Sequence, residues 1–134
     1  MIFLDSSFII AYANEQDSLH DKALSIATDL DNGKYGTPVI TDYVFDEVIT
    51  TILVRTKNLK KVMEIGEKLL DTTLMLRIDV NLFDETWRNF KDQKEAKLSF
   101  TDCSIIVACK ANGIATLATF DSDLKKLSKL SVID

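Results

Sequence analysis

Three aspartates stand at the ends of apolar segments of the chain. Asp5 follows the apolar run 1–4, Asp121 follows the run 115–120, and Asp102 opens a helical run just before that second segment. Parallel strands bring their carboxyl ends to one edge of a sheet, and ligands of open α/β sheets bind at that edge. Carboxylates gathered there repel one another unless a cation or a proton joins them. The spacing therefore predicts a site for a hard divalent metal ion, and with it phosphate chemistry.

Each aspartate also has an ordinary structural interpretation. Asp5 and Asp121 could each cap the helix that follows, and Asp102 with Ser99 fits a capping box. Asp102, however, opens a helical stripe that faces the core, where an unpaired carboxylate is costly. The residues of this stripe are Ile105, Ile106 and Cys109. Three acids at one sheet edge fit chance capping poorly, so their joint arrangement favours the metal site.

A fourth acid is expected from the helix after the second strand. Asp46 and Glu47 lie on opposite flanks of its apolar stripe. Helical geometry alone does not choose between them, and either could be a solvated surface acid.

The elements that must position these acids alternate regularly along the chain. Strand-like runs are predicted at 1–5, 37–41, 73–80, 114–120 and 130–133. Helices are predicted at 6–13, 17–30, 42–56, from Asn58, from Asn81, at 99–112 and at 121–127, with Asp42 as an N-cap and a polar loop at 91–97. This order predicts one α/β domain over residues 1–134, with a central parallel sheet of four to five strands and helices on both faces.

Several other side chains bear on function. Trp87, with Phe83 and Phe90, indicates a core position, although an exposed Trp87 could stack on a base. His20 is the only histidine and falls on a polar helix face, so we expect it to be solvated and no Ser-His-Asp site to exist. Cys103 and Cys109 lie six apart on one helix and cannot bridge each other.

Charge and hydropathy limit the possible partners. The net charge of −5 argues against a sequence-independent nucleic-acid coat protein but not against a nuclease. Two basic groups could still receive an RNA backbone. They are Arg55, Lys57, Lys60 and Lys61, and Arg88, Lys91, Lys94 and Lys97. Neither a secretory signal nor a membrane-length apolar run is present, so a cytoplasmic protein without membrane contact is expected.

The residues around the acids resemble the motifs of the PIN-domain nucleases, and among them the compact VapC-type toxins. An apolar strand, an acid and a hydroxyl two residues later open the chain, and an acid followed by spaced small and apolar residues forms the third motif. The second motif is the weakest, and it selects Glu47 over Asp46. The matching segments are Ile2 to Ser7, Thr37-Pro38-Val39 with Glu47, Asp102-x-x-Ile105-x-x-Ala108-x-x-Ala111-x-Gly113, and Leu117-x-Thr119-x-Asp121-x-Asp123-Leu124. Leu124 departs from the family, which often has an aromatic there.

The resemblance implies an endoribonuclease that uses Mg²⁺ or Mn²⁺ to hydrolyse RNA phosphodiesters. Its metal ligands and catalytic acids would be Asp5, Asp102, Asp121 and Glu47, with Glu47 either ligating or orienting the attacking water. Ser7 and Thr119 hydroxyls would support the site, and Asp123 would be a reserve ligand. The resemblance also implies an antitoxin protein as partner and a homodimer.

Three alternatives remain open at this point. The chain could be a housekeeping PIN nuclease of RNA processing or a catalytically silent PIN-fold binding module. A phosphoacceptor domain would need a lysine at the end of a late strand, where this chain has Asp121.

Overall fold

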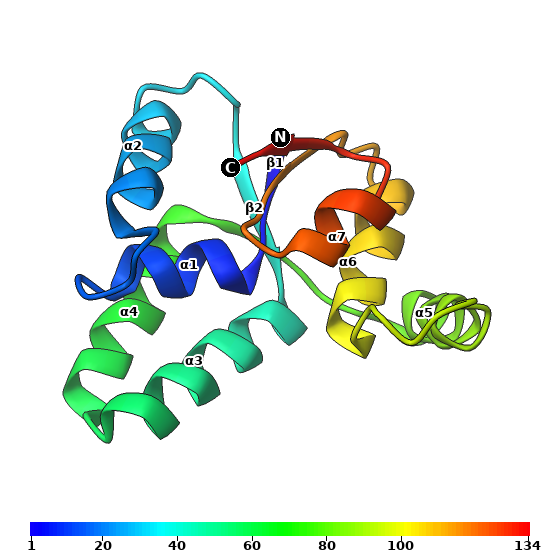
Figure 1. Cartoon of the computed structure of the whole chain (residues 1–134), viewed down its shortest axis with the longest axis horizontal. Helices are drawn as coiled ribbons and strands as arrows, with labels where there is room; N and C mark the ends of the chain where they lie inside the picture. Colours follow the sequence, from blue (N-terminus) through cyan, green and yellow to red (C-terminus); the bar gives the residue numbers. More distant parts are fainter.

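The computed structural model describes residues 1–134 and has five parallel strands surrounded by helices (Figure 1). The strands are short, and the helices supply most of the ordered backbone. The elements are β1 (Ile2–Leu4), α1 (Ser6–Ala13), α2 (His20–Asp31), β2 (Pro38–Thr41), α3 (Asp42–Thr56), α4 (Leu59–Thr72), β3 (Leu74–Leu76), α5 (Val80–Lys91), α6 (Phe100–Ala111), β4 (Thr116–Ala118), α7 (Ser122–Leu127) and β5 (Ser131–Ile133). The predicted α/β class and parallel sheet are confirmed.

The strand order β3-β2-β1-β4-β5 contains one reversal of direction. From β1 the chain moves outward through β2 to β3, then returns past β1 to β4 and β5. Right-handed crossovers therefore place α1 to α4 on one face and the later helices on the other, as Figure 1 shows. The order reverses between β1 and β4, which is where ligands of such sheets bind.

The register of β1 and β4 brings their carboxyl ends together. Leu4 pairs with Ala118, and the Asp5 amide donates to the Ala118 carbonyl at 3.0 Å. The next residues of the two strands, Asp5 and Thr119, therefore leave the sheet side by side.

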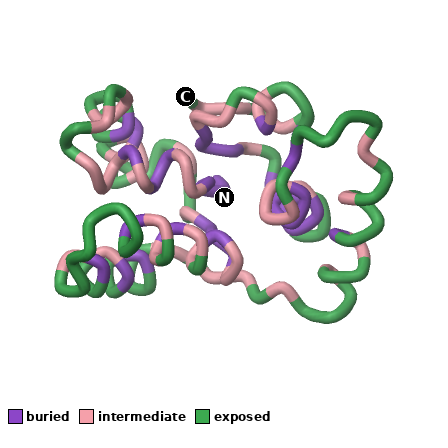
Figure 2. The backbone as a smooth tube through the Cα atoms, turned by 60° about the horizontal axis from the view of Figure 1, so that its bottom comes forward, coloured by how far each residue is buried: buried purple, intermediate pink, exposed green.

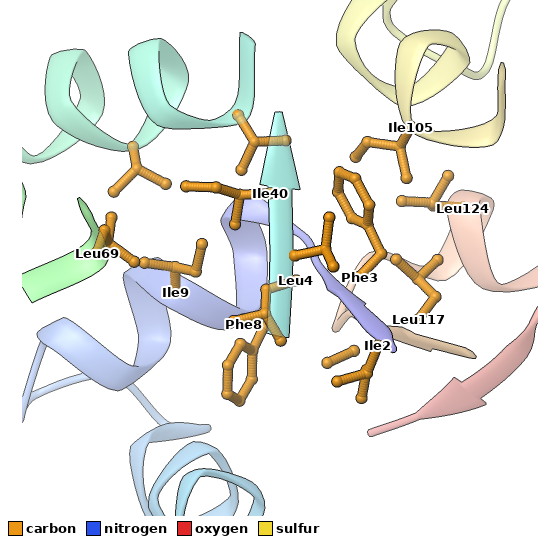
Figure 3. Packing of buried hydrophobic residues seen from close by; sticks show 14 of the residues in the cluster. Ile2, Phe3, Leu4, Phe8, Ile9, Ile40, Leu69, Ile105, Leu117 and Leu124 are labelled. Atoms are coloured by element: carbon orange, nitrogen blue, oxygen red, sulfur yellow. The ribbon is translucent and has the colours of Figure 1, made fainter. Parts of the chain in front are cut away.

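The core lies on both faces of β1, whose three residues are all buried. This explains why the segment is uniformly apolar instead of alternating. Figure 3 shows Phe3 pointing toward Ile105 and Leu124, whereas Ile9 lies near Leu69 on the other side of the sheet. The buried residues concentrate along the strands and the inward sides of the helices (purple in Figure 2).

Several predicted boundaries shift for local reasons. The second helix begins at His20 and not at Asp17, whose carboxylate instead accepts the Leu19 amide at 2.9 Å within a preceding turn. The predicted cap at Asp42 is wrong. Thr41 caps α3, and the Asp42 carboxylate accepts the Ile78 amide at 3.0 Å. That contact takes the chain out of the sheet after β3, so the strand predicted at 73–80 ends at Leu76.

The fourth strand is also shorter than its apolar sequence. After β4 the Phe120 amide donates to the Ser7 hydroxyl at 2.9 Å, which turns the chain away from the sheet. The helix predicted from Asn81 begins at Val80 with Asp79 as its cap. The polar segment predicted as a loop does follow α5, which ends at Lys91.

The predicted core role of Trp87 and Phe83 is wrong, because these side chains are 47% and 45% exposed. Helix α5 packs mainly against α6, and its one buried residue is Thr86. The apolar stripe of α5 therefore lies at the edge of that contact, with Phe90 only half-buried.

His20 is not solvated as expected. It is half-buried, and its Nδ1 lies 2.9 Å from the Ala11 carbonyl, which joins α2 to α1. Cys103 and Cys109 are buried and unpaired, as expected, and burial raises the pKa of the Cys109 thiol to about 12. No helix combines the length and apolar character needed to span a membrane.

Candidate metal centre

Asp5 stands at the carboxyl end of β1 and is only 2% exposed. Its Oδ2 accepts hydrogen bonds from the Ser7 hydroxyl at 2.5 Å and the Thr119 hydroxyl at 2.7 Å, and from the Ser7 amide at 3.3 Å. Its Oδ1 accepts a single long contact of 3.4 Å from the Ser6 hydroxyl. The carboxylate is therefore held through Oδ2, and Oδ1 remains available.

The two hydroxyls that hold Asp5 are oriented by backbone amides. Phe120 donates to Ser7 Oγ at 2.9 Å, and Asp121 donates to Thr119 Oγ1 at 3.0 Å. Each hydroxyl thus accepts a hydrogen bond from a backbone amide and donates its own proton to Asp5. The Asp5 carboxylate, and not either hydroxyl, is therefore the group that can accept a further proton here. The supporting role expected for Ser7 and Thr119 thus has a geometric basis in this network.

Asp121 caps α7 with one carboxylate oxygen. Its Oδ1 accepts the amides of Asp123 at 2.9 Å and Leu124 at 2.7 Å, and its Oδ2 makes no hydrogen bond within the protein.

Asp102 divides its oxygens in the same way. The capping box with Ser99 is present, and Asp102 Oδ2 accepts the Ser99 amide at 2.7 Å while its Oδ1 makes no such bond. Burial raises the pKa of Asp102; the Ser99 contacts lower it, and the charges of Asp5 and Asp121 raise it further. The carboxylates of Asp5, Asp102 and Asp121 therefore interact electrostatically at the same edge of the sheet.

The cap and ligand interpretations of these aspartates are thus compatible. In each case one oxygen is used to begin a helix or to orient the side chain, and the other makes at most one long hydrogen bond within the protein. Fixing a carboxylate through one oxygen reduces the rotamer freedom that a bound ion would otherwise have to remove.

Glu47 and Asp46 differ in their surroundings. Glu47 is half-buried, and burial raises its pKa; the Ser6 hydroxyl lowers it, and the charges of Asp5, Asp102 and Asp46 raise it. Asp46 is exposed and its Oδ1 accepts a 3.4 Å contact from Thr50. Tertiary packing therefore half-buries Glu47 within range of the charges of Asp5 and Asp102 and leaves Asp46 exposed to solvent.

Asp123 differs from the four acids in the groups that its charge influences. Its charge raises the pKa of Lys97 and is not among those that act on Glu47 or Asp102. Its backbone amide serves the site by bonding to Asp121.

The four acids fit a hard cation by donor type, although they do not form a closed ligand cage. No three carboxylate, imidazole or thiolate side chains are arranged to hold a metal ion directly. Mg²⁺ commonly keeps several waters and takes only one or two protein carboxylates, so an open set of oxygen donors suits it better than Ca²⁺ or Zn²⁺. Unpaired oxygens on three mutually repelling acids are the feature that a cation would satisfy.

Sequence reasoning missed Ser6 and Thr51 at the site, and it named Arg55 only as one of a basic group and not as a neighbour of the acids. Ser6 contacts Asp5 and influences Glu47. Thr51 and Arg55 line a cavity of about 420 Å³ together with Glu47 and Asp121. The four-residue spacing of Glu47, Thr51 and Arg55 was the signal that could have identified this helix face.

Fold and site together define a doubly wound α/β protein with an acidic site at its topological switch point. Residues 2–130 match the PIN domain, and the chain therefore belongs to the PIN domain family. No curated protein sequence matches it significantly.

Solved structures share this fold at low sequence identity. VapC20 of Mycobacterium tuberculosis, a toxin that cleaves the sarcin-ricin loop, is 22% identical, with a TM-score of 0.82 over 94% of each chain. PAE2754 of Pyrobaculum aerophilum is 16% identical, with a TM-score of 0.71 over 98% of this chain and 81% of that one. VapBC2 of Rickettsia felis, solved with a DNA fragment from its promoter, is 17% identical, with a TM-score of 0.71 over 99% and 98%.

Proposed function

We propose that the protein is an Mg²⁺- or Mn²⁺-dependent endoribonuclease and the toxin of a VapBC-like toxin–antitoxin pair. The observation that carries this proposal is the mutual electrostatic influence of Asp5, Asp102, Asp121 and Glu47 at the switch point, with one oxygen of Asp102 and of Asp121 free of hydrogen bonds and Oδ1 of Asp5 in only one long contact. Membership of the PIN family and the likeness to VapC toxins support the reaction class.

In this proposal the aspartates hold the cation and Glu47 prepares the attacking water. The bound cation would lower the pKa of water and offset the charge of the phosphodiester. Asp5 and Asp102 are the primary ligands in this assignment, because their charges, unlike that of Asp121, act on Glu47, and Asp121 completes the set through its free Oδ2. Burial raises the pKa of Glu47 in the metal-free protein, which makes its carboxylate a stronger acceptor for a proton of the attacking water.

The proposed function is tested by incubating the protein with structured and single-stranded RNA in Mg²⁺, in Mn²⁺ and in EDTA. We expect cleavage with either ion, none in EDTA, and none with Asp5→Asn or Asp102→Asn. Glu47→Gln should lose activity, whereas the neighbouring Asp46→Asn should keep it. Cleavage that persists in EDTA or in both aspartate variants would sink the metal-site proposal.

An antitoxin partner is supported by an apolar cavity away from the acids. This cavity, of about 290 Å³, lies between α1, α2 and α4 and is lined by Phe8, Ile9, Ile65 and Leu69 among others. Amphipathic helices of partner proteins bind by laying their apolar face into apolar grooves of this kind. The structure solved for VapBC2 holds more than one component, which share a promoter, and this agrees with a protein partner for the present chain.

A homodimer is supported by the exposed apolar face of α5. Val80, Phe83 and Trp87 lie on this helix and are 76%, 45% and 47% exposed. Helical spacing places the three on one side, and aromatic residues are enriched at protein interfaces.

The housekeeping nuclease alternative shares the same chemistry and differs only in lacking an antitoxin. A silent binding module is less well supported, because all four acidic positions are filled and oriented. No cleavage of any RNA under any metal condition would favour that module.

A further inference from the structure

Three residues on one face of α3 extend from the acidic edge of the sheet to the guanidinium group of an arginine. Glu47, Thr51 and Arg55 are spaced four residues apart and line the same cavity of about 420 Å³. Four helical residues rise by about 6 Å, so Arg55 lies roughly 12 Å along the helix axis from Glu47. The cavity therefore runs from the proposed cleavage centre to a guanidinium group.

Arg55 makes no ion pair. The protein has five ion pairs within 4.0 Å, and Arg55 belongs to none of them, although Asp17, Glu47 and Asp121 line the same cavity. A second cavity, of about 240 Å³, also includes Arg55 and adds Lys61. The Arg55 guanidinium is therefore unpaired and borders two cavities. One of them contains Glu47 and Asp121, and the other contains none of the four acids.

Thr51 differs from most helical threonines of this protein in how its hydroxyl is used. Five threonine hydroxyls in or at the ends of helices donate to the carbonyl four residues earlier; they are Thr28, Thr56, Thr72, Thr73 and Thr86. The Thr51 hydroxyl makes no hydrogen bond within the protein and lines the cavity instead. A free hydroxyl next to a free guanidinium offers the donors that phosphate oxygens accept.

We propose that Arg55 and the Thr51 hydroxyl form a subsite for an RNA backbone phosphate adjacent to the one that is cleaved. The inference rests on the nuclease function proposed above. Arg55 is a positioning residue in this assignment: it holds the strand along α3 so that the neighbouring phosphodiester reaches the acids. Its guanidinium is suited to the task because it stays charged and presents paired donors.

The test measures binding of a fluorescein-labelled single-stranded oligoribonucleotide by anisotropy, in Mg²⁺, on an Asp5→Asn background that leaves the RNA uncut. Arg55→Ala should weaken binding roughly tenfold, the usual scale for a lost charge-assisted hydrogen bond. The slope of log K against log salt should fall in magnitude by about 0.7, the value for one phosphate of a single strand. Arg55→Lys should keep the salt slope but recover only part of the affinity.

The matched control is Lys110→Ala, which removes the same charge from the far end of α6, where Lys110 pairs with Glu85 at 3.5 Å. It should leave both the affinity and the salt slope unchanged. Melting temperatures of all variants check folding. If Arg55 only complements the carboxyl end of α3, Arg55→Ala will lower the melting temperature and leave RNA binding as it was, which overturns the proposal.

The subsite and the nuclease function can fail separately. If the unsubstituted protein cleaves RNA and Arg55→Ala keeps the parental KM and salt slope, the subsite is overturned and the nuclease function stands. Loss of RNA affinity in Arg55→Ala, in a protein that cuts no RNA in any metal, supports the subsite and overturns the nuclease function. Absence of measurable oligoribonucleotide binding overturns the subsite.

Discussion

Thr119, fully buried at the end of β4, donates a 2.7 Å hydrogen bond to Oδ2 of Asp5 at the end of β1. The two residues are 114 positions apart in the sequence and become neighbours because the two strands are parallel and adjacent. This bond links the strands on either side of the switch point and orients the carboxylate proposed as the primary ligand.

Removal of the Thr119 hydroxyl should therefore affect both stability and activity. Thr119→Val keeps the side-chain shape but takes a donor from Asp5 and an acceptor from the Asp121 amide. We expect a loss of about 1–3 kcal/mol in the free energy of unfolding and a fall of about 10–100-fold in metal affinity or activity. Urea unfolding and Mn²⁺ titration provide the measurements. Thr116→Val, in the same strand but without a side-chain hydrogen bond, is the control and should change neither quantity appreciably.

Loss of the α6 cap should likewise have two effects. Ser99→Ala removes the hydroxyl that accepts the Asp102 amide, which should lower stability by about 1 kcal/mol. It also loosens Asp102, so nuclease activity should fall further than the stability loss explains. Asn58→Ala removes the cap of α4, where Asn58 Oδ1 accepts the Lys61 amide at 3.1 Å. Equal activity losses in these two capping variants would contradict a role for Ser99 in orienting Asp102.

Glu47 should destabilise the metal-free protein at neutral pH. Burial raises its folded-state pKa, so the folded state binds this proton more tightly than the unfolded state does. The unfavourable contribution begins as pH rises through the ordinary glutamate pKa of about 4.3 and is complete above the folded value. Glu47→Gln should thus raise the melting temperature in EDTA at pH 7, and the gain should vanish in strongly acidic buffer. An unchanged melting temperature of Glu47→Gln at pH 7 would mean that the charge of Glu47 does not destabilise the folded state.

Metal ions should stabilise the folded chain if the acidic edge binds them. At an Mg²⁺ or Mn²⁺ concentration 100 times the Kd, one site adds about 2.7 kcal/mol. The melting temperature of the parent should rise with either ion, and Asp5→Asn should lose this response. Asp79→Asn changes an acid that caps α5 away from the site, so it should retain the response. A parent protein indifferent to both ions would refute the ligand assignment without any RNA assay.

The exposed face of α5 should control self-association. Trp87→Ser removes the largest exposed aromatic of that face, and size-exclusion chromatography with light scattering should then show a smaller dimer fraction. Leu127→Ser, at an apolar residue of α7 that is 46% exposed, is the comparison and should not alter the mass. A monomeric parent would dispose of the homodimer.

Local patterns predicted most of the fold because they reflect local physics. The alternation of apolar runs and amphipathic segments gave the order of strands and helices, and Ser99 with Asp102 gave a capping box that the structure contains. The boundaries at Asp42, at Leu76 and after Ala118 could not be predicted, because each depends on a contact from elsewhere in the chain. The Asp42–Ile78 and Ser7–Phe120 hydrogen bonds are two such contacts.

The same division applies to the candidate site. The sequence by itself determined that aspartates follow β1 and β4 and begin α6, since residue type and apolar periodicity are properties of the chain alone. Only the tertiary structure decided that Asp102 and Asp121 each bind backbone amides through one oxygen and keep the other free, whereas Asp5 is held mainly by the Ser7 and Thr119 hydroxyls. Helical geometry did not distinguish Glu47 from Asp46; the family motif selected Glu47, and packing supplies the physical reason, because two adjacent helix positions differ in burial according to what lies opposite them. For the same reason Trp87 lies at the surface although it belongs to an apolar stripe. An amphipathic helix buries only the part of its apolar face that a neighbouring helix covers, and α6 leaves Trp87 of α5 partly uncovered.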